Sequence, residues 1–154
     1  MLTRKEENNM KWDKDIIEKM EYGEIKNLEE KQKVAKKIAS YVKDGQTIGF
    51  GSGSTSYLAV IEISKRIKEE GLKIKAIPTS HEIELLCAYL DIPTTTLIKE
   101  KPDWSFDGAD EVNKNNWLVK GRGAAMFKEK LNIANSKITY ILVDESKFVN
   151  NLCD

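Results

Sequence analysis

Three carboxylates stand within five residues of one another in the segment "FDGADEV", at Asp107, Asp110 and Glu111. Closely spaced carboxylates can bind a divalent metal, orient sugar hydroxyls, or tune the pKa of a neighbouring base. Gly108 and Ala109 keep the backbone compact, so Asp107 and Asp110 could face one pocket. Aspartate and glycine also form ordinary surface turns. These residues alone do not decide between a surface turn and the wall of a pocket.

A metal site is the less favoured of these interpretations. The only histidine, His81, lies elsewhere in the chain, and the spacing of the acids does not match an EF-hand loop. His81 lies near the start of an expected helix, which favours a structural first-turn residue over a catalytic one. Carboxylates that orient hydroxyls need no metal.

The glycine-rich segment "GFGSGST" (49–55) offers a second kind of chemistry. A dinucleotide fingerprint would need a glycine where Ser54 or Ser56 stands, and a Walker A loop would need a lysine. What remains is a glycine loop opening a helix, with the Ser52, Ser54 and Thr55 hydroxyls beside free backbone N–H groups. Such a loop suits a single phosphate. A tight strand-to-helix turn with an ordinary cap is the alternative.

A third segment, "LVKGRGAAMFKEK" (118–130), combines a cation with a carboxylate. Lys120 follows an apolar run, and the glycines after it precede a second helix N-terminus that could bind an anion. Glu129 is expected about two turns into that helix. It is either a solvated charge between two lysines or a pocket residue. Lys147, after "LVDES", is either a surface lysine or a phosphate ligand.

Apolar periodicity defines the elements that must position these residues. Segments with helical spacing alternate with short β-branched or apolar segments, which predicts an α/β fold with a largely parallel sheet. Asn27 is expected to begin the first helix, Gly45 to stop it, and Ser80 to cap the third helix. Helices are predicted over about 28–44, 55–70, 81–90 and 124–134, and strands over about 46–50, 73–77, 94–98, 103–107, 116–120 and 137–144.

The polar segments do not scatter along this pattern, because each follows the end of a predicted strand. In open parallel sheets the carboxyl ends of the strands form the ligand crevice. The sequence therefore predicts that five segments converge on one edge of the sheet: the loop 51–55, Thr79 with Ser80, Asp107 to Glu111, Lys120 with Gly121, and Asp144.

Composition limits the partners of the chain. Its 154 residues, 40% hydrophobic and 32% charged, are typical of one globular domain. The 25 basic and 25 acidic residues balance, which argues against nucleic acid or an anionic membrane as a partner. No apolar run approaches a spanning helix, the N-terminus is too polar for a signal peptide, and the two cysteines show no metal-type spacing. We expect a cytoplasmic protein with a charged extension over 1–26 and a domain over 27–154.

The motifs "GFGSGST", "FDGADEV", "LVKGRGAAMFKEK" and "ILVDESK" occur in the order and approximate spacing of the ribose-5-phosphate isomerase A family, which the chain resembles from about Lys31 to Lys147. The resemblance implies a Rossmann-like three-layer domain with a mostly parallel sheet. It also implies an aldose–ketose isomerase, without cofactor or metal, that interconverts D-ribose 5-phosphate and D-ribulose 5-phosphate through an enediolate in the non-oxidative pentose phosphate pathway. The implied partners are a small sugar phosphate and other copies of the chain, as a dimer or tetramer.

Roles follow from the resemblance position by position. Glu129 matches the general base, and Asp107 and Lys120 match catalytic residues at the sugar carbonyl and hydroxyls. Neighbouring acids would raise the pKa of Glu129 and Lys120 would lower it, a balance that the sequence leaves open. The implied substrate-binding residues are Ser52, Gly53, Ser54, Thr55, Asp107, Gly108, Ala109, Asp110, Lys120, Gly121, Arg122, Gly123, Lys147 and Lys31.

Two features depart from the family pattern. Arg122 stands where the family has the middle glycine of a Lys-Gly-Gly-Gly run, which would be costly if that position needs a positive φ. The chain also ends at Asp154, so the family's C-terminal α+β lobe is expected to be missing. Its absence would leave apolar surface exposed and favour poor stability or self-association. A sugar-phosphate-binding domain without efficient catalysis therefore remains the alternative function.

Overall fold

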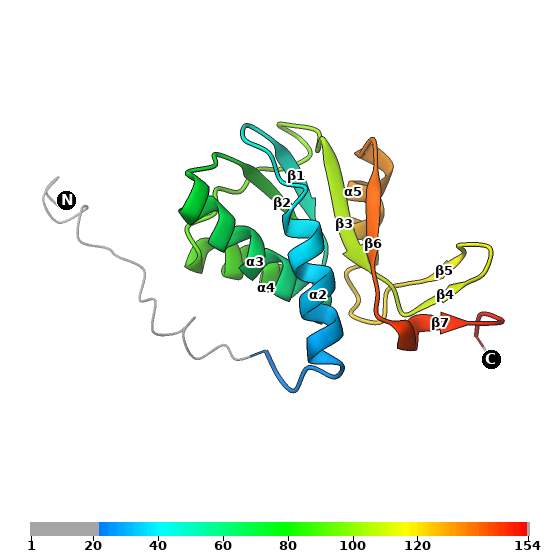
Figure 1. Ribbon diagram of the computed structural model, residues 1–154. Helices are drawn as coiled ribbons and strands as arrows, with labels where there is room; N and C mark the ends of the chain where they lie inside the picture. Colours follow the sequence, from blue (N-terminus) through cyan, green and yellow to red (C-terminus); the bar gives the residue numbers. More distant parts are fainter. Residues whose placement is uncertain (1–21, 154) are drawn as a thin grey trace, which may run out of the picture.

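The computed structural model describes residues 22–153, and its element order alternates helices and strands (Figure 1). The helices are α2 (Leu28–Ala39), α3 (Ser54–Glu70), α4 (His81–Tyr89), α5 (Met126–Asn135) and the short 3₁₀ helix Glu145–Lys147. The strands are β1 (Thr47–Phe50), β2 (Lys75–Pro78), β3 (Trp104–Gly108), β4 (Glu111–Asn113), β5 (Leu118–Val119), β6 (Thr139–Leu142) and β7 (Phe148–Val149).

The main sheet has four parallel strands in the order β2-β1-β3-β6. Figure 1 shows α5 on the far side of this sheet from α2. On the α5 side, Asn132 donates a hydrogen bond to the Ile77 carbonyl and lies close to Gly49. Helices on both faces of a parallel sheet make the three-layer α/β arrangement that the sequence predicts.

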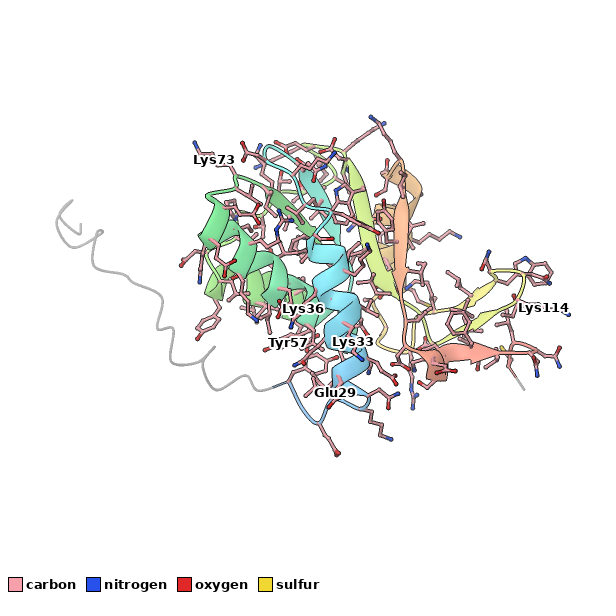
Figure 2. The ribbon with its side chains drawn as sticks, viewed as in Figure 1. Glu29, Lys33, Lys36, Tyr57, Lys73 and Lys114 are labelled. Atoms are coloured by element: carbon pink, nitrogen blue, oxygen red, sulfur yellow. The ribbon has the colours of Figure 1, made fainter. Side chains whose placement is uncertain are left out.

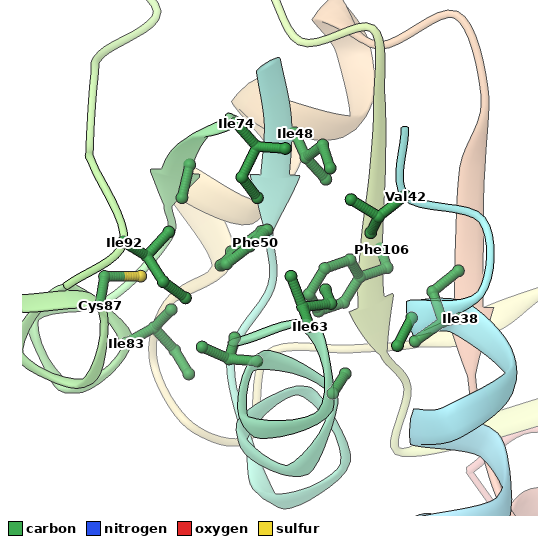
Figure 3. Packing of buried hydrophobic residues seen from close by; sticks show 14 of the residues in the cluster. Ile38, Val42, Ile48, Phe50, Ile63, Ile74, Ile83, Cys87, Ile92 and Phe106 are labelled. Atoms are coloured by element: carbon green, nitrogen blue, oxygen red, sulfur yellow. The ribbon is translucent and has the colours of Figure 1, made fainter. Parts of the chain in front are cut away.

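Apolar side chains of α2, α3 and α4 form one core with the strands (Figure 3). Phe50 and Phe106 lie on adjacent strands with their ring centroids 5.1 Å apart. Ile63 of α3 and Ile83 of α4 are fully buried beside them. Each fully buried side chain of this size stabilises the fold by roughly 1.5–3 kcal/mol. The core therefore fixes the carboxyl ends of β1 and β3, from which two polar loops begin.

A second, three-stranded sheet has the order β5-β4-β7. It corrects the prediction of a strand over 116–120 in the main sheet, because only Leu118 and Val119 are extended and they pair antiparallel with β4. Asn113 causes the turn between β4 and β5, since its side-chain oxygen accepts the N–H groups of Asn115 and Trp117 at 3.0 Å each. Strands β4 and β7 were not predicted from the sequence.

The predicted strand over 94–98 is wrong except at its first residue. Thr94 makes an isolated parallel bridge with Ala76, beside the outer edge of β2. Beyond it the chain turns, because the N–H groups of Lys99 and Glu100 both donate to the Thr96 carbonyl at 3.0 Å. Ile98 is 97% exposed. With no buried face to pack, the β-branched composition alone does not hold the segment in the sheet.

Three predicted helix signals have mixed outcomes. Ser80 caps α4, accepting the Ile83 N–H at 3.3 Å, as predicted. Gly45 does not stop the first helix, because α2 ends at Ala39 and single turns follow it. Asn27 does precede α2, but its side chain makes no capping hydrogen bond. The fourth helix begins at Met126, two residues after the predicted start at Ala124, whose φ of 60° belongs to a turn.

Helix α2 carries four lysines, of which only Lys31 is buried. Figure 2 shows Glu29, Lys33 and Lys36 along this helix, and all three are exposed.

Of the proposed N-terminal extension only residues 22–26 are described. There the ring of Tyr22 packs against the ring of Tyr57, with the ring centroids 4.8 Å apart. No helix within residues 22–153 is both long and apolar enough to cross a membrane.

Candidate active site

A pocket of about 160 Å³ lies where β1, β3 and β6 end, and Asp110 and Lys120, on either side of the β4–β5 hairpin, also line it. All fifteen candidate residues from the sequence line it. They are Lys31, Ser52, Gly53, Ser54, Thr55, Asp107, Gly108, Ala109, Asp110, Lys120, Gly121, Arg122, Gly123, Glu129 and Lys147. The convergence expected from strand ends therefore occurs for four of the five segments, while Thr79 and Ser80 lie outside the lining.

Asp107 is the last buried side chain of β3 and is 2% exposed. Its Oδ1 accepts hydrogen bonds from the Gly108 N–H at 2.8 Å and the Ser52 N–H at 3.2 Å. Its Oδ2 lies 2.9 Å from Lys120 Nζ. A Cβ at Gly51 would stand 2.4 Å from Asp107 Oδ1. The close approach of the β1 loop to Asp107 therefore requires glycine at position 51.

Lys120 connects this aspartate to Glu129. The Lys120 Nζ lies 3.3 Å from Glu129 Oε2 and also donates to the Gly108 carbonyl. Glu129 is 6% exposed and stands in the first turn of α5, because that helix begins later than predicted. The alternative interpretation, in which Glu129 is a solvated charge on the helix surface, is therefore wrong. A carboxylate, an ammonium group and a second carboxylate meet inside one pocket.

Burial dominates the protonation of both carboxylates. Desolvation raises the pKa of Glu129, the Asp107 charge raises it further, and Lys120 opposes the shift without cancelling it. Desolvation also raises the pKa of Asp107, despite Lys120 and the two backbone N–H donors. The balance for Glu129 that the sequence left open therefore falls on the side of a raised pKa, which suits a group that must both take and return a proton.

The loop before α5 accommodates Arg122 without backbone strain. The positive φ falls on Gly121, at 102°, and not on Arg122. The Arg122 side chain is exposed, while its N–H donates to Asp110 Oδ2 at 3.1 Å. Asp110 is thereby tied to the loop at one end and, through its own N–H, to the Val119 carbonyl at 2.8 Å. Arg122 therefore does not occupy a positive-φ position, and the cost expected for such a position does not arise.

The other end of the pocket is rich in donors for an anion. Helix α3 begins at Ser54 after Gly53, whose φ is 86°, and no side chain caps its N-terminus. Uncapped first-turn N–H groups and the helix dipole favour a negative ligand. Lys31 donates to Ser54 Oγ at 3.0 Å, and Lys147 lines the same pocket. Ser52 reaches Thr79 through their hydroxyls, 2.6 Å apart.

Three further residues line the pocket that were not among the candidate site residues: Leu142, Val143 and Asp144, of which Asp144 alone was among the strand-end segments expected at this edge. The strand-end position of Asp144 was the available signal, but its contacts with Asn27 and Lys31 join residues far apart in sequence and could not be inferred. Glu111, in contrast, does not line the pocket. Its Oε2 accepts the Cys153 N–H at 2.8 Å, consistent with a structural role at the second sheet.

The sequence comparisons with known proteins agree on one family. The model of the family described as ribose 5-phosphate isomerase A (phosphoriboisomerase A) matches residues 75–154. Ribose-5-phosphate isomerase A 1 of Oceanobacillus iheyensis is 44% identical over 123 residues, which are 79% of this chain and 55% of the relative. The chain thus spans about half the length of the curated relatives it matches.

Solved structures give the same assignment. Ribose 5-phosphate isomerase A from Methanocaldococcus jannaschii superposes with a TM-score of 0.80 at 43% identity, over 82% of this chain and 56% of the other. A D-ribose-5-phosphate isomerase in complex with phospho-erythronic acid superposes with a TM-score of 0.80 at 36% identity, over the same shares of the two chains. The chain therefore belongs to the ribose 5-phosphate isomerase A family.

Proposed function

We propose that this chain catalyses the interconversion of D-ribose 5-phosphate and D-ribulose 5-phosphate, a step of the non-oxidative pentose phosphate pathway. The single observation that supports this best is the buried cluster of Glu129, Lys120 and Asp107 in one pocket, with contacts of 3.3 and 2.9 Å. Such a cluster offers a base, a cation for a developing oxyanion and an acceptor for a hydroxyl proton. The family assignment supports the same reaction.

The proposed mechanism uses the cluster in two proton transfers. Glu129 takes the proton from C2 of the open-chain aldose, and the electrons move onto O1 to give an enediolate. The Lys120 ammonium and the N–H groups around Gly121 stabilise the negative charge on the oxygens. Glu129 returns its proton to C1, and the hydroxyl proton on O2 passes to O1 with Asp107 beside it. No net proton, electron or water is consumed.

The anion-friendly end would hold the phosphate. Lys31, Lys147 and the N-terminus of α3 supply two cations and several backbone donors to the pocket. Binding the phosphate there would present the other end of the sugar to Glu129. A structural relative carries phospho-erythronic acid, a phosphorylated sugar acid, which supports the same class of ligand for this chain.

The test is the Glu129→Gln variant, assayed by the appearance of ribulose 5-phosphate from ribose 5-phosphate. A positioned base contributes about 100- to 10,000-fold to the rate, and we expect kcat to fall by that factor while substrate binding persists. Glu69→Gln, an exposed glutamate on α3, is the matched control and should keep full activity. Unchanged turnover in Glu129→Gln would show that another group is the base.

The same assay separates catalysis from simple binding. A wild-type chain that binds ribose 5-phosphate, as followed by calorimetry, but forms no ribulose 5-phosphate would be a sugar-phosphate-binding domain.

We further propose that the isomerase domain covers residues 27–154, with residues 1–26 as an extension. We also propose that it works in the cytoplasm as a homo-oligomer, which the exposed apolar residues beside β6 support, Ile138 among them.

A further inference from the structure

Lys31 is held in an environment that disfavours its charge. It is 8% exposed and lies in the first turn of α2, where the helix dipole opposes a cation. Desolvation lowers the pKa of Lys31, and the charge of Lys147 lowers it further, while Asp144 acts in the opposite direction. A buried ammonium needs a compensating partner to remain charged. Lys31 can contribute a positive charge to phosphate binding only if it keeps its proton.

Asp144 meets this need through an unusual division of its two oxygens. Its Oδ1 accepts three hydrogen bonds: from Ser146 N–H at 3.0 Å, from Ser146 Oγ, and from Asn27 Nδ2 at 3.2 Å. Its Oδ2 is buried and accepts no hydrogen bond from the described residues, and it lies 3.9 Å from Lys31 Nζ. The side chain is 1% exposed, so the free oxygen lies near the lysine and is shielded from bulk water.

The hydrogen bonds also keep Asp144 ionised. Burial alone would raise the pKa of Asp144, but the donors from Ser146 and Asn27, together with the charge of Lys31, hold it below its usual range. Lys31 in turn donates to Ser54 Oγ at 3.0 Å. An ammonium group has three donors, so it can contact Ser54 and Asp144 and still donate to a phosphate oxygen. Pairwise contacts thus connect Asn27 to Asp144, Asp144 to Lys31 and Lys31 to Ser54, and the last three of these residues line the pocket.

We propose that Asp144 is a positioning residue that holds the Lys31 ammonium at the phosphate end of the pocket, and that Asn27 fixes the orientation of Asp144. The role of Asp144 rests on the proposed use of this pocket for a sugar phosphate, but it can be tested without turnover. Charge alone makes the opposite prediction. Removing an anion near a bound dianion would tighten phosphate binding if Asp144 acted only through space.

The experiment measures binding of inorganic phosphate and of ribose 5-phosphate to the purified chain, by calorimetry, for wild type and Asp144→Asn. We expect affinity for both to fall by about 10- to 100-fold, with KM rising and kcat little changed. The matched control is Glu145→Gln, which removes a negative charge from the neighbouring exposed side chain and should not weaken binding. Asn27→Ala should weaken binding in the same direction, by about 3-fold.

Two further readouts separate positioning from a structural role. In a Lys31→Met background, Asp144→Asn should have little further effect, since the two side chains would act as one unit. With Asp144→Asn, the pKa of Lys31 should fall further, because only its lowering causes remain. The rise of KM with increasing pH should therefore begin at a lower pH than in wild type.

The outcomes also separate this proposal from the proposed function. Weaker phosphate binding in Asp144→Asn, with a wild type that binds but does not isomerise, would support the positioning role and contradict the isomerase. Tighter or unchanged binding in both Asp144→Asn and Asn27→Ala would overturn the positioning role, whatever the wild-type activity. If Asp144→Asn does not fold, Asn27→Ala still decides the matter, because its side chain is exposed. No phosphate binding by wild type would contradict both proposals.

Discussion

The central charges of the pocket act as a coupled set, because Lys120 lies between two buried carboxylates. Lys120 Nζ is 2.9 Å from Asp107 and 3.3 Å from Glu129. Burial favours the neutral acid in both carboxyl groups, and the lysine favours the carboxylates. The protonation of Glu129 therefore depends on Lys120 even where Lys120 does not touch the substrate.

This coupling predicts a shift in the pH profile at the residue scale. Glu129 must be ionised in the free enzyme to act as a base, so kcat/KM falls as the pH drops through its raised pKa. Replacing Lys120 with methionine removes the one charge that lowers this pKa, so the acidic limb should move to higher pH. Asp107→Asn removes a charge that raises it, so the limb should move to lower pH.

The measurement is the midpoint of the acidic limb of kcat/KM, which is independent of the large loss of rate expected in both variants. Wild type and Glu69→Gln, whose carboxylate is exposed on α3, provide the reference profile. A midpoint in Lys120→Met that stays in place or moves to lower pH would contradict the assignment of this limb to Glu129.

At the residue scale, the sequence predicted which residues line the pocket better than it predicted their side-chain contacts. The candidates that follow β1 and β3 line the pocket because the carboxyl ends of parallel strands meet at one edge of the sheet, whereas Lys120 reaches it from β5 of the second sheet. The burial of Glu129 could not be predicted, since lysines precede and follow it in the chain and only the fold turns it inward. The contact of Asn27 with Asp144 joins residues 117 positions apart. No local pattern carries such information.

At the scale of elements, the helices and the strands of the main sheet followed the apolar periodicity, and the short strands of the second sheet did not. Strands β4 and β7 have only three and two residues, and they pair across a long stretch of chain. The segment 94–98 has a strand-like composition but exposed side chains, so packing does not hold it in the sheet. Sequence predicts an element well where one of its faces is buried in the core.

Gly51 offers a test of how β1 positions the pocket. An alanine there would place its Cβ 2.4 Å from Asp107 Oδ1 and 2.5 Å from both Asp107 Cα and the Phe106 carbonyl oxygen. Two of these are backbone atoms, so β1 and β3 must separate. We expect Gly51→Ala to lower the free energy of unfolding by about 1–3 kcal/mol and to reduce activity by displacing Asp107.

Urea denaturation of Gly51→Ala and of Gly23→Ala would check this prediction. Gly23 has no atom within 4 Å of an added Cβ and is exposed, so its replacement should leave stability unchanged. Equal stability of the two variants would mean that the β1 loop tolerates a wider separation from Asp107 than its present packing indicates.

At the scale of the whole molecule, β6 ends the main sheet, and no described strand pairs with its outer edge. Apolar side chains next to β6 are open to solvent: Ile138, which directly precedes the strand, is 54% exposed, and Tyr41, which packs on Tyr140, is 37% exposed. An unpaired edge with apolar flanks is a template for pairing with another chain. We therefore expect the homo-oligomer proposed above to form through β6.

Sedimentation velocity on wild type, Ile138→Lys and Ile98→Lys tests this expectation. A lysine beside an edge strand opposes pairing, so Ile138→Lys should shift the protein toward the monomer. Ile98→Lys makes the same chemical change at a side chain that is 97% exposed in the loop after Thr94, near the opposite edge of the sheet. It should leave the assembly intact. If all three chains sediment as monomers, the homo-oligomer is wrong; if both variants dissociate equally, charge and not β6 controls the assembly.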